Sequence, residues 1–159
     1  MKNKKTNWVD SLSEAGGYIS AIFMILIVIL INTGRIVRSF FDSSTYIADE
    51  YSSYFLVAVV LLGLAYALKE QAHIRVEVIR GRLSEQGKRV VDICGILAGL
   101  LLTLFITYHS IQMVWDSYSL DITADSISET PLYIPQLMIP IGLLLFALQL
   151  VATLIRRLR

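Results

Sequence analysis

The sequence predicts an all-α membrane protein with four transmembrane helices, and three observations lead to that prediction. The chain of 159 residues is 55% hydrophobic and only 17% charged, and its mean hydropathy is +0.64. A soluble domain usually has about 25% charged residues, so the apolar excess requires a bilayer. Four separate apolar stretches are each long enough to span one. We therefore expect a single integral membrane domain over residues 1–159.

Each predicted helix follows from an apolar run bounded by charged or helix-breaking residues. The first run is free of charge from Tyr18 to Ile31, and Ser84 is a candidate N-cap for the third helix. The fourth helix begins among the three prolines of the chain, and Pro140, the deepest, is expected to cause a local kink. The four helices are expected over residues 15–37, 47–68, 84–115 and 132–155.

The basic residues predict the orientation of the chain, because Lys and Arg resist translocation. Twelve of the fourteen Lys and Arg residues fall in the N-terminal segment, the loop after the second helix and the C-terminal segment. The other two, Arg35 and Arg38, follow the first helix. Both termini are therefore expected in the cytoplasm. A short amphipathic cytoplasmic segment is expected between helices two and three, where Val76, Ile79 and Leu83 share a face.

The residue types argue against an enzyme. Cys94 is the single cysteine, and the two histidines, His73 and His109, are expected on opposite sides of the membrane. No nucleophile and base arrangement or phosphate-binding glycine loop is present, so we assign no catalytic, cofactor or metal residue. A net charge of +1 gives no argument for a nucleic acid partner.

Charged residues are also absent from the centres of the four spans, where a stand-alone secondary transporter usually needs one. Small and polar residues within the spans instead indicate helix packing, either inside the chain or with another subunit. Gly95 and Gly99 form a GxxxG pair, and Gly63 with Ala67 forms a looser version. The packing candidates are Gly63, Ala67, Gly95, Gly99, His109 and Gln112.

The stretch from Gly63 to Glu77 carries the most specific motif. A small-residue apolar run leads to a basic residue, a short spacer and the pattern His-x-Arg-Val-acid. With an acid opening helix two and prolines leading into helix four, this layout resembles the small membrane (Q, DctQ-like) subunit of tripartite ATP-independent periplasmic (TRAP) transporters. The residues that carry the motif are Glu50, Gly63, Lys69, His73, Arg75, Val76 and Glu77.

The resemblance implies a non-catalytic scaffold subunit of a sodium-coupled, substrate-binding-protein-dependent secondary transporter for organic acids (carboxylates). A large membrane subunit (M) is then expected to carry the substrate and sodium sites, so this chain needs no cofactor. A periplasmic binding protein (P) is expected to dock on its outer face, which implies that the chain lies in the inner membrane of a bacterium. Exposed charges steer such encounters, and the docking candidates are Arg35, Arg38, Asp42, Asp49, Asp116, Asp121, Asp125 and Glu129.

Two alternatives remain open at this stage. A small homodimeric four-helix exporter would use Glu14 as its proton-coupled carboxylate and requires that side chain to be embedded in the membrane. A haem-binding membrane anchor would use His109. The position of Glu14 ahead of the apolar core argues against the exporter.

Overall fold

The computed structural model describes residues 7–41, 46–70, 84–126 and 128–158. The helices are α1 (Asn7–Phe41), α2 (Tyr46–Lys69), α4 (Glu85–Ser119), the short α5 (Tyr133–Gln136) and α6 (Met138–Leu158). Four helical spans, the last comprising α5 and α6, are long and apolar enough to cross a membrane. The prediction of an all-helical protein with four spans is confirmed. The predicted amphipathic segment between the second and third spans lies outside the described residues.

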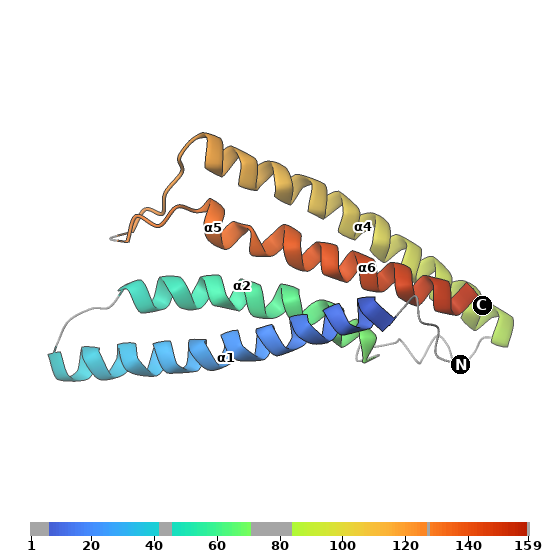
Figure 1. Ribbon diagram of the computed structural model, residues 1–159, viewed down its shortest axis with the longest axis horizontal. Coiled ribbons are helices and arrows are strands. Elements are labelled where there is room, and N and C mark those ends of the chain that lie inside the picture. Colours follow the sequence, from blue (N-terminus) through green and yellow to red (C-terminus); the bar gives the residue numbers. More distant parts are fainter. Residues whose placement is uncertain (1–6, 42–45, 71–83, 127, 159) are drawn as a thin grey trace.

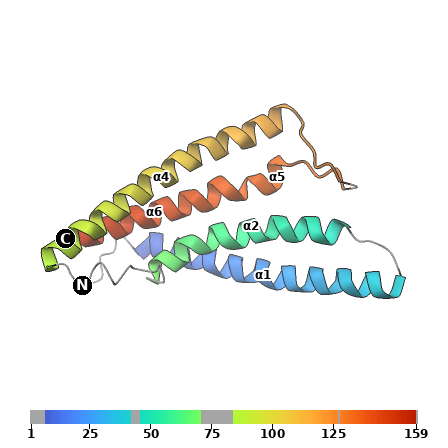
Figure 2. The ribbon, with the colours of Figure 1, turned by 180° about the vertical axis from the view of Figure 1, so that it is seen from behind.

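The helices form two antiparallel pairs that lie side by side in the order α1, α2, α6, α4 (Figures 1 and 2). The main packing partners of α2 are α1 and α6, whereas α4 packs against α6 and the adjoining α5. The start of α1 and the end of α6 lie at one end of the molecule, here named the terminal end. The distal end is formed by the end of α1, the start of α2, the end of α4 and residues 120–132.

The helices extend beyond the predicted bounds because an apolar run marks the bilayer rather than the end of a helix. α1 begins at Asn7 rather than at residue 15, and α4 continues to Ser119 rather than 115. A helix of 35 residues, such as α1, is about 50 Å long, whereas the hydrocarbon core is about 30 Å thick. At the other end of α4, the predicted N-cap is confirmed, since the Ser84 hydroxyl accepts from the Gly87 amide at 3.3 Å.

The fourth span is interrupted at Leu137, between α5 and α6. Pro140 has no amide hydrogen to donate to the Gln136 carbonyl, and its ring crowds that carbonyl. The break one turn before Pro140 is therefore where a proline-induced kink is expected. Pro140 itself lies in the first turn of α6, where a missing donor costs little.

Glycines allow the helices on both sides of α2 to approach it closely. A Cβ placed on Gly142 of α6 would lie 2.6 Å from the Leu61 Cβ, and one on Gly17 of α1 would lie 2.7 Å from the Tyr66 ring. In lipid, such close backbone contact replaces the hydrophobic drive that packs helices in water. The Gly142 contact joins the two helix pairs, whereas the Gly17 contact packs α1 against α2 within one pair.

Candidate functional site

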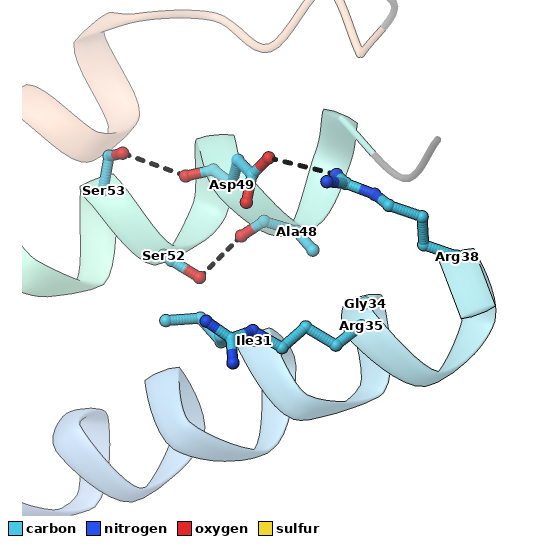
Figure 3. Close-up of a pocket in the computed structure, with 8 residues that line it drawn as sticks. All are labelled: Ile31, Gly34, Arg35, Arg38, Ala48, Asp49, Ser52 and Ser53. Atoms are coloured by element: carbon cyan, nitrogen blue, oxygen red, sulfur yellow. Dashed lines mark hydrogen bonds and ion pairs between the residues drawn. The ribbon is translucent and has the colours of Figure 1, made fainter. Parts of the chain in front are cut away.

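A pocket of about 450 Å³ lies at the distal end between α1 and α2 (Figure 3). It brings together three predicted docking residues, Arg35 and Arg38 of α1 and Asp49 of α2. Arg38 Nη2 lies 3.7 Å from Asp49 Oδ2, and both side chains are well exposed, at 59% and 75%. An exposed pair at this distance contributes little to stability, so these charged groups remain accessible to a ligand or partner.

Glu50 anchors the distal loop, residues 120–132, to the start of α2. Both of its carboxylate oxygens lie within 2.9 Å of the Ser128 hydroxyl, and the Tyr54 hydroxyl donates to Oε1 at 2.7 Å. Thr130 extends this cluster through Ser128 at 2.8 Å and contacts the Tyr51 hydroxyl at 3.2 Å. Hydrogen bonds to a charged carboxylate are about twice as strong as neutral ones. The motif acid therefore holds a loop that lies more than seventy residues away in the sequence.

The distal loop presents acidic side chains. Asp121 and Glu129 both adopt positive φ angles, of 48° and 44°, a conformation that non-glycine residues adopt mainly in turns. A bridge between Thr123 and Pro131 closes the loop between these two turns. The exposed docking candidates in and beside this loop are Asp116, Asp121, Asp125 and Glu129. Asp42, the remaining docking candidate, lies outside the described residues.

A polar network that the sequence analysis missed joins α1 to α6 near the terminal end. Gln149 is fully buried; its Oε1 accepts from the Ser13 hydroxyl at 3.0 Å, and its Nε2 donates to Asp10 at 3.3 Å. Arg156 donates to both Asp10 carboxylate oxygens at 2.6 Å. The available signal was the amide of Gln149 deep within the apolar run of the fourth span. Buried polar groups need partners, and this one finds them on the first helix.

Ion pairs flank this network. Lys69, the motif's basic residue, donates to Glu14 at 2.7 Å and to Glu70 at 3.0 Å. Asp92 of α4 lies 3.1 Å from Arg157 of α6. The Glu14 side chain is 49% exposed, so Glu14 is a paired residue at a helix end rather than an isolated carboxylate within the bundle.

One long face of α4 has no packing partner among the described residues. His109 Nδ1 lies 3.2 Å from Gln112 Oε1, and Gln112 donates to the Tyr108 hydroxyl at 3.0 Å. All three side chains are exposed, together with Leu101 and Phe105 on the same side of the helix. The opposite face of α4 meets α6 through its buried residues Thr103, Thr107, Ser110 and Ser117. The polar candidates therefore point out of the bundle.

The small-residue packing candidates also fall into two groups, one in contact with another helix of the chain and one facing away from the bundle. A Cβ on Gly63 would lie 3.3 Å from the Ser20 hydroxyl oxygen of α1, whereas one on Gly95 or Gly99 would meet nothing within 4 Å. Ala67, one turn after Gly63, is half-buried. The GxxxG pair of α4 thus has room for a partner that the chain itself does not supply. The motif residues His73, Arg75, Val76 and Glu77 lie outside the described residues.

These features define a multi-pass membrane protein whose polar groups serve packing and surface contact, with no potential metal-binding cluster among the described residues. The family model described as "Tripartite ATP-independent periplasmic transporters, DctQ component" matches residues 19–159. The chain therefore belongs to the DctQ family and is the small membrane subunit of a TRAP transporter. The family expected from the Gly63 to Glu77 motif is confirmed.

Two relatives bear matching names. A TRAP transporter small permease protein of Haemophilus influenzae is 28% identical over 123 residues, which cover 77% of this chain and 74% of the relative. The ectoine TRAP transporter small permease protein TeaB of Halomonas elongata is 26% identical over 144 residues, covering 88% and 74%. No solved structure matches significantly. With the family shown, nothing favours the exporter or haem-anchor alternatives.

Proposed function

We propose that this subunit is a non-catalytic scaffold for a large membrane subunit, which carries out sodium-coupled uptake of organic acids delivered by a periplasmic binding protein. In this proposal the terminal end faces the cytoplasm, the distal end faces the periplasm, and the chain lies in the inner membrane. The observation that carries the proposal is the position of the charges. Within the spans, charged groups are confined to the ends of the apolar runs, and several are paired there with one another.

Membrane transport requires groups that bind or release the driving ion within the bilayer. This chain uses Gln149, a fully buried amide of the fourth span, to join α1 to α6. Its remaining hydroxyls in the spans bond largely to their own helix, as Thr103 and Thr107 do. These polar groups are engaged in holding the bundle, which supports a static role and leaves transport to a partner.

The exposed face of α4 is the proposed contact with the large subunit. His109 lies about ten residues, or about 15 Å along the helix, from the end of α4. That position places its polar cluster with Gln112 and Tyr108 inside the apolar run that ends at Asp116. Polar side chains at such depth usually face protein rather than lipid. The open Gly95 and Gly99 positions add space for a closely packed helix.

Co-purification with the large subunit tests this contact. Substituting both His109→Leu and Gln112→Leu is expected to lower the amount of large subunit recovered, because the interface loses its polar partners. Asn32→Leu is the matched control. Among the described residues, the exposed Asn32 amide on α1 bonds only to its own helix, at the Val28 carbonyl. Equal recovery from the double variant and the control would contradict α4 as the contact.

The acidic distal loop is the proposed meeting point for the binding protein. Exposed charges mainly accelerate encounter, and this effect weakens as salt screens them. Reversing Asp121, Asp125 and Glu129 to Lys is therefore expected to slow uptake at low ionic strength and to have less effect at high ionic strength. Unchanged uptake at low salt would remove the loop from docking.

The substrate class depends on the partners. The relative from Halomonas elongata is named for ectoine, whereas our proposal for this chain is an organic acid. Uptake assays on the complete transporter, with and without a sodium gradient, distinguish the substrates and the coupling ion. Uptake that is independent of sodium would overturn that part of the proposal.

A further inference from the structure

The described residues that line the distal pocket carry more positive than negative charge. Arg35, Arg38 and Asp49 are its charged lining residues, and only Arg38 and Asp49 form a pair, at 3.7 Å. Among the described residues, Arg35 has no hydrogen-bond or ion-pair partner. In Figure 3 its side chain runs back along α1 toward Ile31, in the space between α1 and α2. Within the described part of the chain, the Arg35 guanidinium of the pocket is therefore not paired with a carboxylate.

The two serines of the pocket do not compete with the arginines as donors. The Ser52 hydroxyl donates to the Ala48 carbonyl at 2.6 Å, and the Ser53 hydroxyl donates to the Asp49 carbonyl at 2.9 Å. Among the side chains that line the pocket, the free donors are therefore the guanidinium N–H groups. Their planar arrangement suits two-pronged recognition of phosphate or carboxylate oxygens.

The depth of the pocket in the membrane favours phosphate over carboxylate as its anion. α1 has no charged residue between Glu14 and Arg35, a run of twenty residues that is about 30 Å long and matches the hydrocarbon core. Arg35 thus lies where the hydrocarbon ends and the lipid headgroups begin, and Arg38 lies one turn further out. Below Arg35, the same stripe of α1 exposes Ile31, Val28 and Met24, which offer an apolar track for an acyl chain.

We propose that this pocket binds the phosphate group of a phospholipid, with Arg35 as its principal ligand and Arg38 as the second. The pocket lies at headgroup depth, and a carboxylate on a soluble binding protein would have to reach below the membrane surface to contact Arg35. Asp49 opposes the bound anion and limits its affinity. This site is separate from the acidic loop proposed for docking, and the inference does not depend on the transported substrate.

Binding of short-chain phosphatidylglycerol to the purified subunit in detergent, followed by native mass spectrometry, tests the site. Arg35→Gln is expected to weaken binding roughly tenfold, because it removes a charge-assisted contact. Asp49→Asn is expected to strengthen it by about two- to fivefold, because it removes an opposing charge. A misfolded variant would not bind more tightly, so the opposite signs separate a binding site from a general loss of structure.

Two control variants and two control ligands complete the experiment. Arg89→Gln removes an exposed arginine at the terminal end and is expected to leave binding unchanged; Arg35→Lys keeps the charge and is expected to retain part of the affinity. Diacylglycerol of the same chain length, which lacks phosphate, is expected to bind poorly, as is inorganic phosphate alone. The proposal is overturned if Arg35→Gln binds the lipid normally, if Asp49→Asn weakens binding, or if either control ligand binds as tightly as the phospholipid. It is also overturned if Arg35→Gln reduces capture of the periplasmic protein while lipid binding is unchanged.

Discussion

Substituting Gly142→Ala is expected to destabilise the bundle by separating its two helix pairs. The added methyl group would lie 2.6 Å from the Leu61 Cβ, 2.8 Å from its carbonyl carbon and 2.9 Å from its carbonyl oxygen. Carbon atoms in good contact are about 3.5–4.0 Å apart, so α6 must shift by about 1 Å from α2. Two of the three crowded atoms are backbone atoms and the third is the Leu61 Cβ, so a change of side-chain rotamer moves none of them.

The expected cost is about 1–3 kcal/mol, the usual range for inserting a methyl group into a packed interior. A loss of about 1.4 kcal/mol changes the unfolding equilibrium tenfold. Unfolding in mixed micelles with increasing SDS, followed by helical circular dichroism, measures this change. Gly95→Ala is the matched control, because a methyl group there meets nothing within 4 Å, and it is expected to leave the stability of the isolated subunit nearly unchanged.

Equal stability of Gly142→Ala and Gly95→Ala in the isolated subunit would refute the close packing of α2 and α6. A larger side chain at Gly95 gives a second assay of the exposed face of α4. If α4 meets the large subunit, Gly95→Leu reduces the recovery of that subunit even though the isolated chain remains stable.

Three further perturbations address the polar contacts. Glu50→Ala is expected to speed amide hydrogen exchange in the distal loop by roughly tenfold or more, because it removes a charged acceptor. Glu50→Gln is expected to have a smaller effect. Equal exchange rates in the wild type and both variants would contradict the role of Glu50 as an anchor for this loop. Gln149→Ala is expected to lower stability by about 1–3 kcal/mol, because Ser13 loses its partner in a buried site, and an unchanged SDS midpoint would argue against the network. A double-mutant cycle on Lys69 and Glu14 is expected to give a coupling of about 0.2–1 kcal/mol that falls with salt, and a coupling of zero at low salt would contradict the pair.

The four spans could be predicted from the sequence because the bilayer requires long charge-free runs, which are visible without any tertiary information. The break at Leu137 could be expected from Pro140 for a similarly local reason. The true helix ends could not be predicted. Asn7 and Ser119 lie in segments where polar and apolar residues alternate without a clear period, so the residue pattern fits a helix or a loop equally well. Contacts with neighbouring helices determine where each helix ends.

The sequence predicted only part of the candidate site. Arg35 and Asp49 could be assigned to the same membrane face from topology, but their shared pocket depends on how closely α1 approaches α2. Glu50 was singled out by its motif, and its role as an anchor for Ser128 depends on a contact across 78 residues. Gln149 was overlooked because a neutral amide hardly interrupts an apolar run, and only the fold brings Ser13 to it.

Reconstitution into liposomes tests the central claim most directly. Transport of radiolabelled substrate is measured in three samples: this subunit alone, the large subunit and the binding protein without this subunit, and all three proteins together. A scaffold role predicts no transport by this subunit alone and full uptake only when all three are present. Substrate accumulation by this subunit alone, or full uptake in its absence, would contradict that role.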